Sequence, residues 1–281
     1  MLRRAFVSVD LEGMPYVVSR AHIASGKPLW NEAREIATSV VNAVAEALRG
    51  EGVEEVVIAD SHGEMVNVMP SKLPSYAYII RGYPRPVSMV ALSEGCDAAL
   101  FVGYHAKSGT ERGVFDHTYS GAVIRELRIN GEAVSEYLLN ALTLGDKGIP
   151  VILVAGDEAL REEVSRNTPW AEFVPLKRGL SRYAAISPSL DRVKQMLRDA
   201  VKSAVARFAR GEAKPLKPPK PIRVDIVFHS SAYADTAELM PGAKRVDPTT
   251  VSYTADDMTS AYRAFELLVL AAIGTKYVAE R

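Results

Sequence analysis

The stretch Ala5-Phe6-Val7-Ser8-Val9-Asp10-Leu11-Glu12-Gly13 places a short apolar run directly before two carboxylates. The same order recurs in Val56-Val57-Ile58-Ala59-Asp60-Ser61-His62 and in Ala98-Ala99-Leu100-Phe101-Val102-Gly103-Tyr104-His105. Apolar runs of this length are typical of buried parallel strands. Ligands of open α/β sheets bind just beyond the carboxyl ends of such strands. The three stretches therefore predict that carboxylates and imidazoles meet at one edge of a sheet, as they do in a metal site.

The segments around these runs complete an α/β pattern. A helix is expected from Asn31 to Gly50, because its apolar residues recur at helical spacing. A fourth strand is expected at Pro150 to Ala155, and Ser135 to Leu144 reads as a helix capped by Ser135. The strand–helix–strand order predicts an α/β fold: a mostly parallel sheet flanked by helices in three layers.

After about residue 170 the composition changes, and a second, smaller α+β domain is expected. Its predicted strands are Tyr183–Ile186, Ile222–Phe228 and Val246–Thr254, and its predicted helices are Ser189–Arg210, Ala232–Met240 and Ala255–Ile273. The expected division is therefore a metal-binding α/β domain at 1–170 and a smaller α+β domain at 171–281. An alternating segment from Gly121 to Ile129, followed by Asn130-Gly131, predicts a hairpin before the second domain.

Composition narrows the class of protein. The chain has 281 residues, with 34 Lys+Arg and 34 Asp+Glu, so its formal net charge is +0. This balance argues against general nucleic-acid binding, which normally needs a basic surface. No apolar run reaches the roughly 20 residues that span a bilayer, and Asp10 and Glu12 interrupt the stretch where a signal peptide would need its apolar core. With a single cysteine, Cys96, the chain is expected in the cytoplasm, without membrane partners.

The carboxylates at the end of the first run can share a cation. Asp10 and Glu12 are two residues apart, so in an extended segment both side chains point the same way. Gly13 then lets the chain turn away. A solvated strand end followed by a turn is the alternative interpretation, and this motif alone does not exclude it.

The histidines supply nitrogen ligands. His62 follows Asp60 and Ser61, and an imidazole beside an orienting acid is common at metal and acid–base sites. His105 alone would read as a satisfied buried histidine, but it ends a strand at the same predicted edge. His117, in the loop before the hairpin, is open to three roles: ligand, base or surface residue. His22 and His229 are assigned no role.

Glu136 gives no such signal, because an acid near a helix start most often complements the helix dipole.

Mixed oxygen and nitrogen ligands suit zinc, with manganese or iron as alternatives. Two ions bridged by a carboxylate such as Asp10 would polarise a carbonyl and supply a nucleophilic water. Neither a glycine-rich phosphate loop nor a Gly-x-Ser-x-Gly elbow is present.

Taken together, these motifs resemble the zinc-dependent D-aminopeptidases of the DppA type, from dipeptide-transport operons. The resemblance runs across nearly the whole chain in one order. Its landmarks are Ser8–Gly13, Asp60–His62, Gly103–Ala106, His117, Ile129 through Glu136 to Ala141, Val154–Asp157 and Pro248–Val251.

The resemblance implies a two-zinc aminopeptidase site. The family's metal-ligand positions fall on Asp10, Glu12, His62, His105 and Glu136, with Asp10 expected to bridge, and its catalytic nucleophile or base falls on His117. It also implies a homo-oligomer, a ring-like decamer whose active sites face an inner chamber and admit only short peptides.

Three features depart from the family pattern and bear on substrate preference. Asp116 precedes His117 where a small polar residue is expected, and an acid there is able to raise the pKa of His117. Ser135 precedes Glu136 where glycine is expected, and the loop after Gly13 is distinct.

The sequence thus predicts a zinc-dependent aminopeptidase that hydrolyses the N-terminal bond of short peptides, D-residues included. Two alternatives stay open at this point. One is another binuclear metallohydrolase, an amidase or a phosphoesterase, and the other is a non-catalytic peptide-binding oligomer.

Overall fold

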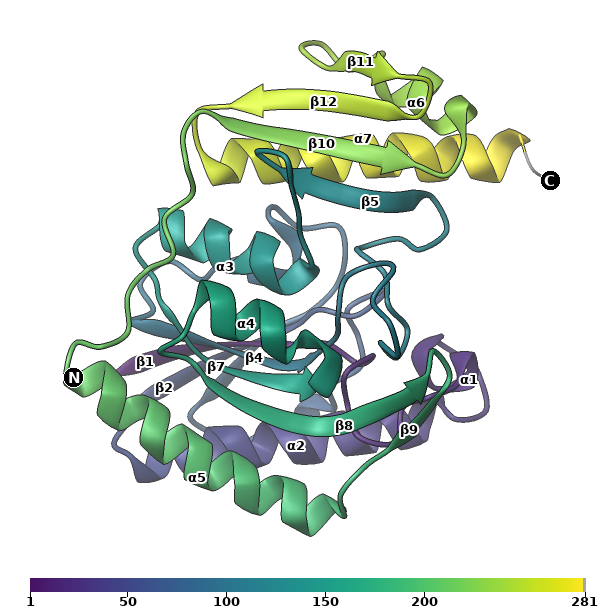
Figure 1. The fold of residues 1–281 in the computed structure, drawn as a ribbon. Helices are drawn as coiled ribbons and strands as arrows, with labels where there is room; N and C mark the ends of the chain where they lie inside the picture. The colour runs from purple at the N-terminus through teal and green to yellow at the C-terminus, as the bar shows by residue number, and fades with distance from the viewer. Residues whose placement is uncertain (280–281) are drawn as a thin grey trace.

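Parallel pairing of the buried runs builds the larger of two sheets in the computed structural model, which describes residues 1–279 (Figure 1). Its order is β3-β2-β1-β4-β7-β8-β9, and every neighbouring pair is parallel except β8 and β9. The strands are β1 (Arg4–Val9), β2 (Glu55–Asp60), β3 (Ala77–Ile80), β4 (Ala98–Tyr104), β7 (Val151–Asp157), β8 (Glu172–Ser181) and β9 (Ala184–Ile186).

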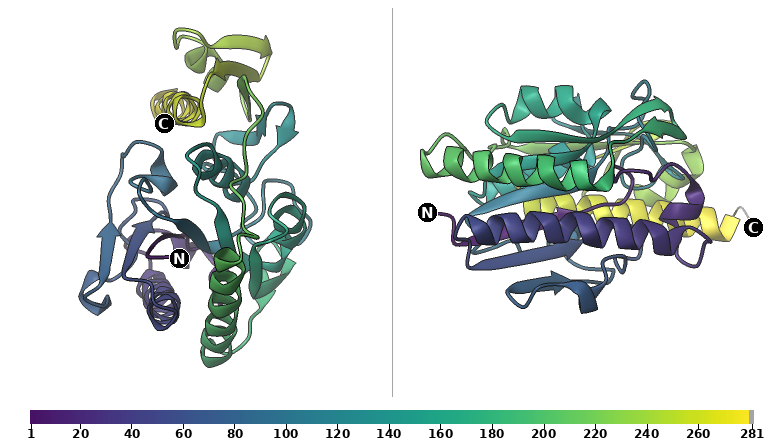
Figure 2. Two further views of the ribbon diagram at one scale, coloured as in Figure 1. Left: turned by 90° about the vertical axis from the view of Figure 1, so that its left-hand side faces the viewer. Right: turned by 90° about the horizontal axis from the view of Figure 1, so that it is seen from below.

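Helices cover both faces of this sheet, so the expected three-layer α/β fold is confirmed. One face carries α2 (Trp30–Gly50) and α5 (Leu190–Ala209), and the other carries α3 (Glu136–Asp146) and α4 (Arg161–Asn167) (Figures 1 and 2). A single-turn helix, α1 (Arg20–Ile23), precedes α2, and short 3-10 turns lie at Pro70–Lys72, Ser88–Val90 and Glu158–Leu160.

A second, antiparallel sheet lies beyond α3, in the order β11-β12-β10-β5-β6 (Figure 1). Its strands are β5 (Ile124–Ile129), β6 (Glu132–Ala133), β10 (Ile222–Phe228), β11 (Lys244–Asp247) and β12 (Thr250–Ala255). Two helices, α6 (Ser231–Ala237) and α7 (Met258–Ala279), pack on each other and on β10 and β12. The strand expected over Val246–Thr254 is in fact a hairpin, because the chain turns between β11 and β12 at Pro248.

The two sheets do not separate near residue 170. The larger sheet continues to β9, whereas β5 and β6 from the first part of the chain join the second sheet. One buried apolar cluster also runs from the upper face of the larger sheet, at Phe6 and Phe101, through α3 to β10 and α7. A division into separate domains at 1–170 and 171–281 stays a prediction, but the strands are not sorted in that way.

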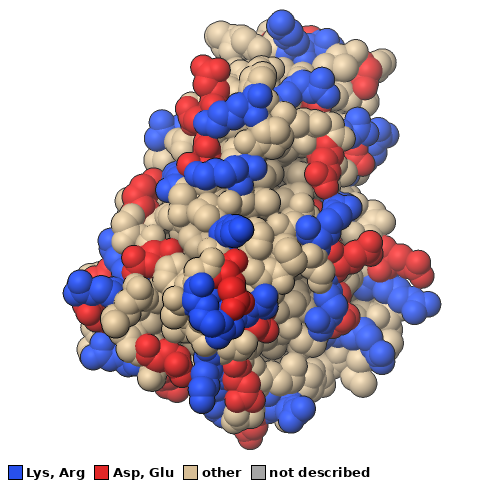
Figure 3. All heavy atoms as spheres, turned by 60° about the vertical axis from the view of Figure 1, so that its left-hand side comes forward, with Lys and Arg blue, Asp and Glu red and all other residues tan. Residues whose placement is uncertain are grey.

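A second apolar cluster fills the space between the larger sheet and the α2/α5 layer, with Val7, Val40 and Leu100 among its fully buried members. On the face drawn in Figure 3, Lys and Arg side chains are interspersed with Asp and Glu. Within residues 1–279, none of the helices combines the length and the apolar character that crossing a membrane requires.

Candidate metal centre

Strand register brings three of the sequence motifs to one edge of the larger sheet. Val9 at the end of β1 pairs with Asp60 on one side and with Val102 on the other. The residues that follow these strands, including Asp10, His62 and His105, therefore emerge side by side at the carboxyl edge, as parallel pairing requires.

Close backbone packing fixes the first of these turns. The Gly13 N–H donates to the Gly103 carbonyl at 2.7 Å. A Cβ at Gly13 would lie 1.9 Å from the Tyr104 carbonyl oxygen, and one at Gly103 would lie 2.0 Å from the Asp10 carbonyl oxygen. Gly13 is thus needed mainly for the approach of β1 to β4, rather than for the turn that the sequence suggested.

Carboxylates and imidazoles interleave in the resulting site. His62 Nδ1 lies 2.7 Å from Glu12 Oε2 and 3.3 Å from Asp10 Oδ1. On the other side of Asp10, its Oδ2 lies 3.5 Å from His105 Nε2. Each oxygen of Asp10 therefore faces a different imidazole.

The loop before β5 and the start of α3 close the site. Ser135 caps α3, its Oγ accepting from the Leu138 N–H, and so places Glu136 on the first turn. Glu136 Oε1 then lies 3.3 Å from His105 Nε2 and 3.6 Å from His117 Nε2. The two imidazoles stack with ring centres 4.4 Å apart, and the Tyr119 N–H donates to Glu136 Oε1 at 2.7 Å.

Each imidazole uses one nitrogen to orient itself and keeps the other for the site. His62 Nε2 lies 2.7 Å from the Ile23 carbonyl, His105 Nδ1 lies 2.9 Å from the Ala106 carbonyl, and His117 Nδ1 lies 2.6 Å from the Phe115 carbonyl. Since a carbonyl only accepts, the nitrogen facing it carries a proton, and in the neutral imidazole the opposite nitrogen offers a lone pair. This is the arrangement found around metal-ligating histidines.

The donor set fits a divalent cation. Asp10, Glu12 and His105 offer ligand atoms that all lie within 4.8 Å of one another, and so do His105, His117 and Glu136. Asp10 Oδ2 and His105 Nε2 are buried without a hydrogen-bond partner. Buried polar atoms are rarely left without a partner, so these two atoms are candidates to coordinate a cation.

The pKa values reflect this crowding of charge. Burial and the neighbouring Glu12 raise the pKa of Asp10 to about 8. Although burial acts in the opposite direction, Glu136 and Asp10 raise the pKa of His105 to about 10, and Glu12 and Asp10 raise that of His62 well above its ordinary value. Against its own burial, Glu12 keeps a pKa well below the ordinary value because His62 and His117 lie beside it. Binding a cation here would displace protons, as ligands must be deprotonated to coordinate.

Comparison with known proteins identifies the family. The model of the D-aminopeptidase family, peptidase family M55, matches residues 3–267. The chain belongs to this family. It is 35% identical to the D-aminopeptidase of Bacillus subtilis (strain 168) over 277 residues, which cover 98% of this chain and 99% of the relative. It also superposes, with a TM-score of 0.90 and 33% identity, on the structure of the zinc-dependent D-aminopeptidase DppA from Bacillus subtilis, a self-compartmentalizing protease; the match covers 96% of this chain and 98% of that one.

Membership of the D-aminopeptidase family confirms the expected class of enzyme, a metallo-aminopeptidase. The six residues singled out in the sequence, Asp10, Glu12, His62, His105, His117 and Glu136, all face the same site. The two unassigned histidines lie outside these contacts. His22 accepts from the Ser19 N–H in the capping box of α1, and His229 is exposed after β10.

One expectation about the D-aminopeptidase site was wrong. Asp116 does not raise the pKa of His117, because its carboxylate turns away to accept from the Gly109 N–H at 2.6 Å and to pair with Arg182 at 3.3 Å. Burial and the adjacent His105 instead lower the pKa of His117. The role of Asp116 is to hold the loop, together with Asp157, whose carboxylate accepts from the Val114 N–H.

Lys177 is a residue of the site region that the sequence analysis missed. It lies on β8, is 1% exposed, and its Nζ donates to the carbonyls of Glu12 and, at 2.6 Å, of Val17. Burial lowers its pKa to about 8. The ammonium thus ties the segment that carries Glu12 to the far side of the sheet.

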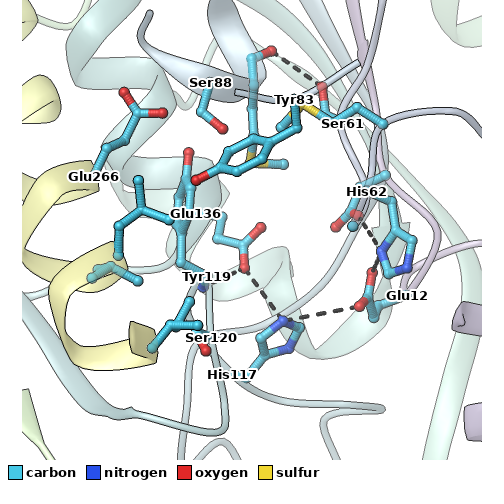
Figure 4. A pocket seen from close by; sticks show the side chains of 17 residues that line it. Glu12, Ser61, His62, Tyr83, Ser88, His117, Tyr119, Ser120, Glu136 and Glu266 are labelled. Carbon is cyan, nitrogen blue, oxygen red and sulfur yellow. Dashed lines mark hydrogen bonds and ion pairs between the residues drawn. The ribbon is translucent and has the colours of Figure 1, made fainter. Parts of the chain in front are cut away.

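A cavity of about 370 Å³ opens in front of these ligands (Figure 4). On one side it is lined by Asp10, Glu12, His62, His117 and Glu136; on the other it is lined by apolar residues of α7, with Tyr83, Met89 and Glu266. This size and mixed lining suit a small ligand such as a short peptide end.

Proposed function

We propose that this chain removes the N-terminal residue of short peptides, D-residues included, with two zinc ions per subunit. The observation that carries this proposal is the convergence of three carboxylates and three imidazoles on one buried site, where His105 Nε2 and Asp10 Oδ2 have no hydrogen-bond partner. Zinc is supported by the mixed nitrogen and oxygen donors and by the relative, which is described as zinc-dependent.

In this proposal Asp10, Glu12, His62, His105 and Glu136 hold the ions. Asp10 is suited to bridge, since its two oxygens face His62 and His105 at 3.3 and 3.5 Å. When bound, such ions polarise a carbonyl and lower the pKa of water toward neutrality. Glu12 is then a ligand rather than the general base.

His117 is proposed as the catalytic nucleophile or base. With its Nδ1–H donated to the Phe115 carbonyl, Nε2 is left free to accept a proton or to attack. Its side chain is 19% exposed, against 1% for His105, and it lines the cavity where a scissile bond would lie. The loop contacts of Asp116 and Asp157 keep the imidazole aimed into that cavity.

The proposal includes a homo-oligomer, with a decamer as the expected size and active sites facing an inner chamber that restricts substrates to short peptides. Its support is the self-compartmentalizing relative and the large apolar side chains that are exposed on the surface, among them Leu239, Leu267 and Val278. A cytoplasmic location is proposed with it, supported by the single buried Cys96.

The test is to substitute Asp10→Ala and His105→Ala and to assay D-Ala peptides with added zinc. We expect wild-type protein to bind two zinc equivalents per subunit in a large closed assembly, and each variant to lose zinc and turnover together. His229→Ala, an exposed histidine outside the site, is the matched control. Activity of either site variant equal to wild type would refute the proposed ligands.

A further inference from the structure

One face of α7 forms the wall of the cavity opposite the metal ligands. Glu266, Val269, Leu270 and Ile273 all line the cavity. Their spacing of three, four and seven residues places them on one side of the helix. Figure 4 shows Glu266 across the cavity from Glu12 and His62. The cavity therefore has a metal side and an apolar side that ends in a single carboxylate.

The Glu266 carboxylate is half-buried, and Arg263 and Arg85 act on its charge only from beyond ion-pair distance. Among residues 1–279, no ion pair includes it. The guanidinium group of the neighbouring Arg85 instead donates hydrogen bonds to the carbonyls of Asp60, Ile80 and Ser88 and to Ser61 Oγ. Burial raises the pKa of Glu266 to about 7, although the Val87 backbone N–H and the charges of Arg263 and Arg85 favour ionisation.

Such a wall matches one kind of side chain. Long cationic side chains bury their methylene stems on apolar surface and extend their charged tips to a polar partner. A cation binds more strongly to a half-buried carboxylate than to a carboxylate exposed to water, because water screens the half-buried pair less.

We propose that Glu266 is a specificity-determining residue, which accepts the cationic tip of a lysine-like or arginine-like side chain on the N-terminal residue of the peptide. The stem of that side chain would lie along Val269, Leu270 and Ile273. This rests on the proposed aminopeptidase function and names the substrate class for the same site: peptides that begin with a basic residue.

The α-amino group is the competing occupant of Glu266. The position of Glu266 argues against it, since the scissile bond must lie at the ligands and the α-amine is only two bonds from the scissile carbonyl carbon. Glu266 lies across the cavity from these ligands (Figure 4), so the side chain of the N-terminal residue, rather than its α-amine, would reach this carboxylate.

The experiment compares D-lysine, D-arginine, D-norleucine and D-alanine p-nitroanilides, using full-length, zinc-loaded protein. Norleucine keeps the stem of lysine without its charge. We expect wild-type kcat/KM to favour D-lysine over D-norleucine by about tenfold to a hundredfold, the usual worth of a hydrogen bond to a charged group. Glu266→Gln should remove that preference and leave D-norleucine and D-alanine nearly unchanged, whereas Glu162→Gln, an exposed acid on α4, should change nothing.

Two results would overturn the inference. One is a wild-type enzyme whose kcat/KM shows no preference for the basic residue. The other is an equal loss of kcat/KM on all four substrates in Glu266→Gln, which would mean that Glu266 binds the α-amine. Calorimetric binding of D-lysinamide and D-norleucinamide separates this from failure of the function itself. If no anilide is hydrolysed, a preference for D-lysinamide that disappears in Glu266→Gln still supports the subsite, and equal binding of the two amides rejects it.

Discussion

The two sides of the active cavity are built in different ways. On the metal side, three carboxylates and three imidazoles lie within a few ångströms of one another, and strand ends, a helix cap and backbone carbonyls fix each of them. On the α7 side, apolar side chains share one helix face with a single acid. Under the proposed function, the first side would hold the metal ions at the scissile bond, and the second would contact the N-terminal residue of the peptide.

The contrast extends to the backbone beneath each side. A Cβ at Gly13 or at Gly156 would lie 1.9 Å from the Tyr104 carbonyl oxygen, so the backbone beneath the ligands is packed too closely to accommodate a side chain at either position. The α7 wall instead belongs to a helix that packs on the second sheet. It lies across the cavity from the ligands (Figure 4). Changes on the metal side should therefore affect every substrate, and changes on the α7 side should affect some substrates only.

The largest effect that tests this contrast is expected from His117→Ala. Loss of the nucleophile or base should lower kcat by about 10²- to 10⁴-fold on all peptides, as general acid–base catalysis is typically worth. Zinc content should stay at the wild-type level, because His117 is not among the proposed ligands. Steady-state kinetics on D-Ala and D-Leu peptides, with metal analysis of the same samples, checks both statements.

The matched control for His117→Ala is His22→Ala, a buried histidine in the capping box of α1. It should cost stability without a comparable loss of kcat. If His117→Ala instead lost one zinc equivalent, His117 would be a ligand, as its cluster with His105 and Glu136 allows.

A smaller effect, still on the metal side, is expected from Lys177→Met. The variant removes the donor to the carbonyls of Glu12 and Val17 and leaves them buried. Residues behind a metal ligand typically contribute 10- to 100-fold in metal affinity or activity, and each unpaired carbonyl costs about 1–3 kcal/mol of folding free energy. Competition with a chromogenic chelator measures the zinc affinity, and thermal unfolding of the metal-free protein measures the stability.

Lys202→Met, on the exposed face of α5, is the control and should leave both quantities unchanged. Wild-type zinc affinity in Lys177→Met, with reduced stability alone, would make Lys177 a purely structural residue.

Lys177 is an example of a residue near the site that could not be predicted from the sequence. Asp10, Glu12, His62 and His105 were predictable because they follow apolar runs, and parallel pairing forces the ends of such runs together. β8 has no such run: Pro175, Lys177 and Arg178 interrupt its apolar residues, so the strand and its buried lysine were both missed. A buried lysine that donates only to carbonyls leaves no pattern in a sequence.

Glu136 and Glu266 were hidden for a different reason. Glu136 looks like any acid on the first turn of a helix, and only the family resemblance placed it near the ligands. Glu266 lies on α7, more than a hundred residues from any ligand in the sequence. It lines the cavity only because α7 packs beside the site in the folded chain. Local propensity predicts such a helix but not which of its faces meets the site.

The smallest expected effect is a pH dependence confined to the α7 side. In the wild type, the ratio of kcat/KM for D-lysine to that for D-norleucine substrates should rise about fivefold from about pH 6 to about pH 8, one unit on each side of a pKa near 7. Below this value Glu266 is mostly protonated and pairs weakly with a cation, and above it the carboxylate is charged. The lysine ammonium stays charged throughout, since its ordinary pKa is about 10.4.

Taking the ratio removes the titration of the metal side, which both substrates share. The charge of Glu266 interacts with Tyr83, Tyr262, Arg85 and Arg263. The ordinary pKa values of tyrosine and arginine side chains lie well above pH 8. The ratio should therefore be flat in Glu266→Gln. A ratio that rises equally in this variant, or one that falls with pH in the wild type, would show that another group sets the preference and that the two sides of the cavity are not independent.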